Sequence, residues 1–383
     1  QPLPQLALPR ALACSPLREP DLVHLRAELA STALPHACIS LAKKLVELVQ
    51  SPTDPMELGD VHNMLIEVRD FLLAEEQVGH CIDLIDLIEP LRERDEALVD
   101  RTLAGFVDPR ALSRILASVQ AVHTAPPEEL VQLLQRVRGD HLSSMLSLLG
   151  SDRHQNHRRI TRQLVELLCE DRHWVVADAM VSAQDPGVAA DLVRVLARVA
   201  SEELYSRIQP MAERQDADIT SELLHFLAQQ AASERLEAAL LVIMDQAPSA
   251  RLRVQAITEL GQRGRPQNCE RLSTWAAEHP TTMSVEEAEA IGAAMARLHP
   301  HRARLRFRTW IRPDGLFARM LGSSSQAEMV QWVAVSGLEH MDAEEDDKIL
   351  EWLRDRAGAH LSRRCQASLV RRRRQRRGGV GHG

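Results

Sequence analysis

The sequence predicts an all-α protein, a right-handed α-solenoid of stacked antiparallel helical hairpins with a more divergent helical N-terminal part. Three observations predict this fold class. Apolar residues recur with the helical period along most of the chain, short segments rich in Pro, Gly and Asp separate these stretches, and only 3% of the 383 residues are aromatic. A core that must consist of Leu, Val, Ile, Ala and Met favours helices over sheets.

The first part of the chain divides into a leader and a helical region. Residues 1–20 contain four prolines in their first sixteen positions, which predicts an extended leader. Residues 21–109 carry helical stripes such as Leu41, Leu45 and Leu48, but no clear repeat phrase. We therefore expect 21–109 to be a divergent N-terminal helical region.

Residues 110–358 show the strongest organisation. Short breakers separate the amphipathic stretches, at 125–127, 139–140, 150–152, 185–187, 247–249 and 263–266. Apolar stripes at helical spacing begin at Leu112, Leu130, Leu142, Ile160, Val188, Ile219 and Leu236. Helices joined by so few residues must pack antiparallel to their neighbours in sequence, so the structural unit is a helical hairpin. Hairpins that recur about every 30 to 38 residues predict a solenoid, in which stacking supplies the core.

Three segments carry a resemblance to a known family. Residues 248–261 (PSARLRVQAITELG) resemble the B helix of a HEAT repeat, and residues 185–188 (DPGV) resemble the Asp-Pro-x-Val turn that opens such a helix. Residues 171–176 (DRHWVV) resemble a phrase of bacterial HEAT-like proteins. The third segment departs from the pattern, because His173 replaces an Arg and no Leu-Gly pair ends its helix near Ser182. The resemblance implies a HEAT-like fold, a binding role and no catalytic residues. It assigns repeat packing to Trp174, Leu252, Ala256, Leu260 and Gly261.

A non-repeating helical bundle would show the same stripes, so it stays open as an alternative fold. For the segment from Ser249 the HEAT resemblance is more specific. It predicts that the helix starts near Ser249 and ends at Gly261, with Leu260 buried against the next hairpin.

Charge divides the chain into an acidic body and a basic end. The net charge is −8, but residues 357–383 contain eight Arg and no acid, which leaves 38 basic against 54 acidic residues, or −16, before them. No stretch is apolar enough to span a membrane. Six cysteines lie at least 24 residues apart without a CxxC pair, which is typical of a reducing compartment. We therefore expect a cytoplasmic protein, and the resemblance to bacterial HEAT-like proteins implies a bacterial one.

Motifs for catalysis or cofactor binding are missing from the sequence. It contains no P-loop, GxSxG, HExxH or GxGxxG motif. The best metal candidates are His154, His157, Cys169 and His173, but a continuous helix would hold the two pairs about 18 Å apart. We therefore expect no enzyme activity, no metal site and no cofactor.

Residues 297–312 form an Arg-rich segment with aromatic residues and no acid. Alternating Arg beside Phe307 and Trp310 is what a surface for phosphates and stacked bases needs. The alternative is a helix whose Arg rows pair with acidic neighbours, for instance the run from Glu339 to Asp347, while Leu305 and Ile311 pack inside. The candidate anion- or partner-binding residues here are Arg302, Arg304, Arg306, Arg308 and Trp310.

The C-terminal end is the second Arg-rich segment. We expect residues 359–383 to form a final helix followed by a disordered tail, because a block of like charge repels itself until it meets a partner. The candidate residues in this block are Arg371, Arg372, Arg373 and Arg374.

These observations favour a non-enzymatic scaffold that binds a protein partner, of unknown identity, along the solenoid surface through anchors such as Trp275 or Trp332. The alternative is a nucleic-acid-binding repeat protein that uses residues 297–312 and the tail. A HEAT-like DNA glycosylase or a lyase on bilin-type substrates is a third reading. The acidic body argues against the nucleic-acid-binding alternative, because negative charge repels phosphate.

The first prediction concerns the fold class. Far-UV circular dichroism should show more than about 60% helix and essentially no strand, because at least nine separate stripes have the helical period. A strand content above about 10% would contradict an all-α solenoid.

Overall fold

The computed structural model describes residues 19–50, 55–123, 125–137, 141–151, 155–169, 171–311, 324–341 and 343–379. The structure is 84% helical, and across the residues described it contains no strand, which confirms the predicted all-α class. Most of the predicted leader, residues 1–18, lies outside the described residues.

The chain forms two compact units, Gln1–Leu168 and Cys169–Gly383. Each unit buries its own apolar core. The boundary between them follows helix α8, whereas the sequence analysis placed the start of the repeats at residue 110.

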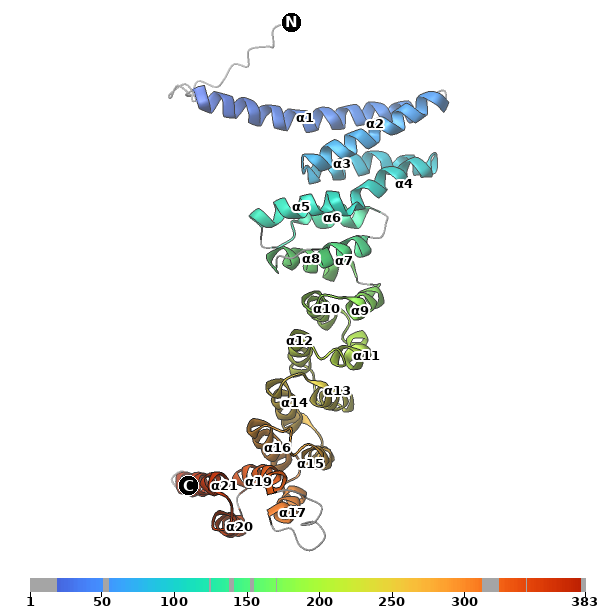
Figure 1. Cartoon of the computed structure of the whole chain (residues 1–383). Coiled ribbons are helices and arrows are strands. Elements are labelled where there is room, and N and C mark those ends of the chain that lie inside the picture. The colour runs from blue at the N-terminus through green and yellow to red at the C-terminus, as the bar shows by residue number, and fades with distance from the viewer. Residues whose placement is uncertain are drawn as a thin grey trace. The chain divides into compact units, whose positions relative to one another are not determined.

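The first unit contains eight α-helices and two short 3₁₀ helices among its described residues (Figure 1). They are α1 (Glu19–Gln50), α2 (Pro55–Ala74), α3 (Val78–Ile88), η2 (Glu89–Glu93), α4 (Glu96–Ala104), η3 (Gly105–Val107), α5 (Pro109–Val122), α6 (Glu128–Arg136), α7 (His141–Ser151) and α8 (Gln155–Leu168).

Helix α3 lies at the centre of the first unit. It buries Cys81, Leu84, Ile85 and Ile88, and it packs against α1, α2 and α6. An aspartate begins the following helix α4, where the Asp95 carboxylate accepts a hydrogen bond from the Leu98 backbone N–H at 2.9 Å. The core of this unit is thus formed by α3 and the helices that pack directly against it.

The second unit contains twelve helices among its described residues. They are α9 (His173–Ser182), α10 (Pro186–Val199), α11 (Ser201–Ala212), α12 (Ala217–Ala228), α13 (Glu234–Gln246), α14 (Ala250–Arg263), α15 (Asn268–Glu278), α16 (Val285–Leu298), α17 (Pro300–Ile311), α19 (Ser324–Glu339), α20 (Glu344–Arg354) and α21 (Ala359–Gly379).

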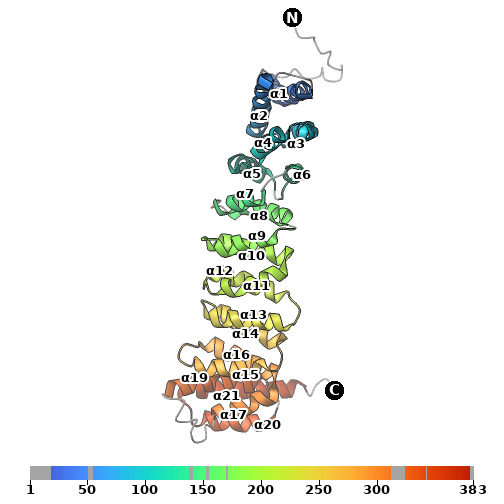
Figure 2. The ribbon, with the colours of Figure 1, turned by 90° about the vertical axis from the view of Figure 1, so that its right-hand side faces the viewer.

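Helices of the second unit pack in two rows. In one row α10 contacts α12, α12 contacts α14 and α14 contacts α16; in the other, α9 contacts α11 and α11 contacts α13. Figures 1 and 2 show the pairs α9/α10, α11/α12 and α13/α14 as successive layers, with one helix of each pair in each row. Further along the chain, α16 packs against α19, and α21 packs against both α19 and α20. We call the side of the second unit formed by α10, α12, α14 and α16 the even-helix face.

Side-chain caps set the starts of the helices in the even row. Asp185 accepts a bond from the Gly187 N–H at 2.8 Å with Pro186 in the first turn, and Ser249 caps α14. Ser284 and Glu287 form a capping box at α16. The predicted helix starts at Pro186 and near Ser249 agree with these caps.

The segment from Ser249 holds buried small and apolar residues, but its end differs from the prediction. Leu252, Ala256 and Leu260 are buried, as is Gly261. Gly261 was expected to end the helix, yet α14 continues to Arg263. A Cβ on Gly261 would lie 2.6 Å from the Cβ of Ala294, so this glycine allows α16 to approach α14 instead of terminating α14.

The packing role expected for Trp174 is wrong. Its side chain is 56% exposed. Helix α9 buries Val176, Ala177 and Met180, which lie on one face, and Trp174 lies off that face.

Two glycines bring α16 and α19 into close contact. A Cβ on Gly292 of α16 would lie 2.3 Å from the backbone oxygen of Val333, and one on Gly337 of α19 would lie 2.2 Å from Cζ of Phe307. At Gly292 the blocking atoms belong to the backbone, so no side-chain rotation can relieve the overlap. Helix α19 thus packs closely against both α16 and α17.

In the part of the chain that the structure describes, no helix is long and apolar enough to cross a membrane. Cys38, Cys81, Cys169, Cys269 and Cys365 are free thiols.

Gly292→Ala should destabilise the protein by roughly 1–3 kcal/mol, because the added methyl group overpacks the contact between α16 and α19. Gly59→Ala in α2 is the matched control. Nothing lies within 4 Å of a Cβ at Gly59, so the better helix propensity of Ala should stabilise α2 by up to about 1 kcal/mol. Urea unfolding of the two variants checks the opposite signs, and equal effects would contradict the close approach.

Candidate functional site

The four arginines of α17 that the sequence singled out are paired with carboxylates. Arg304 Nε lies 3.1 Å from Asp346 Oδ1, and Arg308 donates to Glu345 at 2.6 Å. Arg302 and Arg306 both face Glu270, at 3.7 and 3.5 Å. The pairing that the sequence analysis gave as the alternative to phosphate binding is thus present.

The aromatic residues of this segment do not form a stacking surface. Trp310 is only 1% exposed and Phe307 is fully buried, because both pack into the core beneath α17. The expected inside position is correct for Ile311 but wrong for Leu305, which is 53% exposed. Trp310 is therefore a core residue, and its assignment to a binding surface is wrong.

The second Arg-rich segment is helical through Gly379, so the prediction of a disordered tail is wrong over the described residues. Residues 380–383 lie outside them. The physical reason is charge neutralisation within the chain. The acidic ends of α19 and α20 lie beside α21 and supply the carboxylates that a like-charged helix needs.

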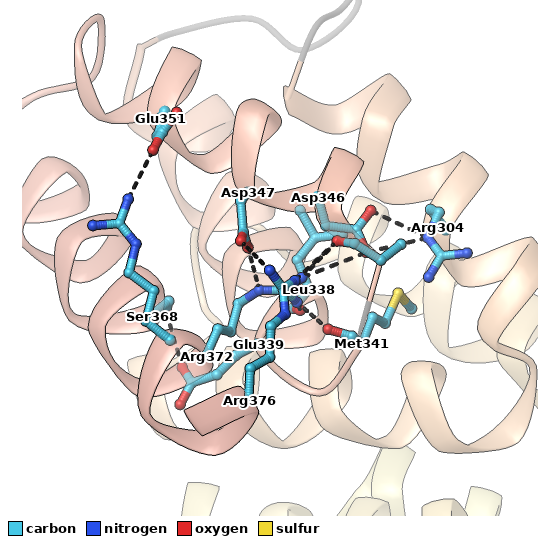
Figure 3. Close-up of polar contacts among 12 residues, drawn as sticks. Arg304, Leu338, Glu339, Met341, Asp346, Asp347, Glu351, Ser368, Arg372 and Arg376 are labelled. Atoms are coloured by element: carbon cyan, nitrogen blue, oxygen red, sulfur yellow. Dashed lines mark hydrogen bonds and ion pairs between the residues drawn. The ribbon is translucent and has the colours of Figure 1, made fainter. Parts of the chain in front are cut away.

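Arg372 is the centre of this contact and is 2% exposed (Figure 3). Its Nε donates to Asp347 at 2.6 Å, and its terminal nitrogens donate to the backbone oxygens of Leu338, Met341 and Ala343. Leu338 and Met341 lie at and just beyond the end of α19, where backbone carbonyls lack donors within the helix. A single guanidinium therefore satisfies the end of one helix and joins it to another.

Glu339 is the second centre of the cluster. It accepts hydrogen bonds from Arg364, Arg371 and Ser368 at 2.8, 2.8 and 2.9 Å. Burial raises the pKa of the Glu339 carboxyl, but these bonds and the nearby guanidinium charges outweigh burial and lower that pKa.

At Asp346, burial and the nearby guanidinium charges also shift the carboxyl pKa in opposite directions, but here burial has the larger effect. Its side chain is fully buried, and burial raises the pKa of its carboxyl more than the charges of Arg304 and Arg372 lower it. The carboxylate of Asp346 is thus the costlier of the two to keep ionised.

Three of the four candidate arginines in this block are paired. Arg371 and Arg373 each bond one carboxylate, of Glu339 and Glu351, while remaining 61% and 58% exposed. Arg374 is exposed, and within the described part of the chain it has no carboxylate partner.

Sequence reasoning missed a polar cleft on the even-helix face. Between α10 and α12 lies a half-open cavity of ≈ 490 Å³. It is lined by Arg194, Ala197, Arg198, Ser221, Glu222, His225, Phe226 and Gln229.

Contacts within the cleft hold its polar groups in place. Arg194 donates to Asp191 at 2.7 Å and to Glu222 at 2.6 Å, which raises the pKa of the Arg194 guanidinium. The Gln229 amide lies 3.0 Å from the imidazole of His225. Arg194 and Glu222 are 28 residues apart and meet only because α10 and α12 are neighbours. No local pattern in the sequence marks that pair.

Neither expected tryptophan anchor is a fully exposed residue. Trp275 is 8% exposed and stacks on His279 at a centroid distance of 4.6 Å, so it is not available to a partner. Trp332 is partly exposed.

Of the metal candidates, His154 lies outside the described residues, and the side chain of His157 is not among those that the structure describes. Cys169 is fully buried. Among the residues described, no group of three or more His, Cys, Asp or Glu is placed to hold a metal ion.

Neither a protein-family model nor a curated protein matches this sequence.

The cluster around Glu339 predicts a pH-dependent loss of stability. Since the pKa of Glu339 is lowered in the folded state, its contribution is complete above its ordinary pKa of 4.5 and is lost as the pH falls through the lowered value. Glu339→Gln should cost about 1–3 kcal/mol at neutral pH and less at about pH 3.

Urea unfolding at both pH values checks this expectation. Glu345→Gln is the control, because Glu345 also has a lowered pKa but is exposed, and its substitution should change stability little. A cost for Glu339→Gln that is equal at both pH values would contradict the role of the ionised carboxylate.

Proposed function

We propose that this protein is a non-enzymatic scaffold that binds a protein partner along the even-helix face, and that its second unit is a HEAT-like α-solenoid. The row of contacts from α10 to α16 supports the repeat architecture, because each helix pair buries its apolar face against the next. The caps at Asp185 and Ser249 fall where the HEAT resemblance puts helix starts.

The observation that carries the binding role is the cleft between α10 and α12. Its volume of ≈ 490 Å³ is in the range of sites that take small ligands or a few residues of a peptide. Its lining offers donors from Arg194 and Gln229, an acceptor from Glu222 and an apolar wall from Phe226. This mixture suits a polypeptide, whose backbone presents both N–H and C=O groups.

Recognition in this proposal is passive. Ion pairs hold Arg194 before any partner arrives, so less side-chain freedom is lost when the partner binds. The partner would contact several helices at once, and the cleft would supply the anchor.

The nucleic-acid alternative has less support. The guanidinium groups of Arg304 and Arg308 already bond carboxylates, and Trp310 is buried. A phosphate would have to displace these internal carboxylates and would meet the negative charge that remained. The readings as a glycosylase or a lyase gain no specific observation.

Site-specific photocrosslinking tests the proposal. A benzophenone side chain placed at Gln229, on the cleft, should form a discrete adduct in an extract of the cells that make this protein. The matched control is Gln209, an exposed glutamine on α11 in the other row. Adducts of equal amount and pattern from both positions would contradict a partner on the even-helix face.

The protein identified in the adduct should then bind the purified chain. Ser221→Trp, which fills part of the cleft, should weaken that binding at least tenfold without lowering the melting temperature. Ser206→Trp on α11 places the same bulk on the other row and should have no effect. Isothermal titration calorimetry measures both, and equal affinities would exclude the cleft as the anchor.

A further inference from the structure

Helix α21 has two faces of different chemistry. The inward face buries Leu361, Cys365 and Leu369 together with Arg372. The outward face exposes Arg363, Val370 and Arg374, which recur at i, i+7 and i+11 and span about 16 Å along the helix. Helix α21 packs against α19 and α20.

The outward face carries positive charge that the described residues do not neutralise. Helix α21 contains eight Arg and no acid. Arg363 and Arg374 have no carboxylate partner in the part of the chain that the structure describes. Arg371 and Arg373 flank them and stay more than half exposed, although each bonds one carboxylate.

The contact of α21 with α20 shows which partner geometry arginines of this helix accept. Asp347 and Glu351 lie one turn apart on α20, and they bond Arg372 at 2.6 Å and Arg373 at 3.0 Å (Figure 3). Helix α21 thus already binds one acidic helix, whose carboxylates have the i, i+4 spacing.

We propose that the outward face of α21 docks an acidic helix of a protein partner. Its carboxylates bond Arg363 and Arg374, and its small apolar side chains pack on Val370. This surface is separate from the cleft between α10 and α12, and it gives the second unit a second attachment point that selects partners by charge.

Two other anionic partners fit this face less well. An amphipathic helix that enters a membrane needs a broad apolar face, but Val370 is the only large apolar residue of α21 that is exposed among its described side chains. A nucleic acid would bring dense negative charge close to Glu339 and Glu351, and α21 has no Phe, Tyr or Trp for stacking.

The test uses the full chain and three fluorescein-labelled helical peptides of about 18 residues. The first peptide has Glu at i, i+4 spacing among Ala and Leu, and its twins have Gln or Lys at the same positions. Fluorescence anisotropy at low salt should show binding of the Glu peptide only, and added salt should weaken that binding because the pairs are exposed.

Charge-reversal variants locate the site. Arg363→Glu and Arg374→Glu should each raise the dissociation constant of the Glu peptide at least fivefold, and together at least twentyfold. Arg251→Glu is the matched control, because Arg251 is an exposed arginine of α14 and the variant has the same net charge. Ser221→Trp in the cleft should also leave this affinity unchanged, so failure here is distinguishable from failure of the partner site on the even-helix face.

Several outcomes would overturn the proposal. They are no binding of the Glu peptide, equal binding of the Gln peptide, or equal losses in the Arg363→Glu and Arg251→Glu variants. Tighter binding of duplex DNA or of phosphatidylserine vesicles than of the Glu peptide would assign the face to that anion instead. Circular dichroism of each variant confirms that an affinity change does not come from unfolding, and Arg363→Gln with Arg374→Gln repeats the test without charge reversal.

Discussion

The fold depends on one constraint: no helix in it can bury its own apolar stripe. Helix α10 shows this plainly, because it buries Leu192, Val195 and Leu196 and packs against α9, α11 and α12. Burial of each such side chain is worth about 1.5–3 kcal/mol, so each helix depends on the next for its stability. Gly292 and Gly337, at the contact of α16 and α19, set how closely the backbones of these two helices approach each other.

At the end of the chain, charge does part of what apolar burial does elsewhere. Helix α21 offers few large apolar side chains to its neighbours, and its buried guanidinium of Arg372 replaces one. A buried charge is costly when it is unpaired. Here Asp347 supplies the countercharge, and the free carbonyl groups near the end of α19 gain donors that the helix itself does not provide. The same contact therefore stabilises two helices.

The local features of this structure could be predicted from the sequence, and the contacts between distant residues could not. Helical periods and caps such as Asp185 are set within a few residues, and they could be predicted. The position of Trp174 could not, because a helix of ten residues with apolar groups on several sides does not show which side its neighbours cover. The helical order of α21 depends on Glu339 and Asp347, more than twenty residues away, and the cleft depends on the meeting of Arg194 and Glu222. For Gly261 the pattern marked an important position but gave the wrong reason for it.

The two proposed surfaces differ in their physical basis, and this difference assigns them different parts in binding. The cleft is lined by groups of both signs that internal ion pairs already hold, so it contributes shape and directed hydrogen bonds, which mainly slow dissociation. The outward face of α21 has exposed like charges and little apolar area, so it contributes attraction over about a Debye length and mainly speeds association. A partner that used both would be attracted by α21 and retained by the cleft. Salt would then lower its association rate far more than it raised its dissociation rate.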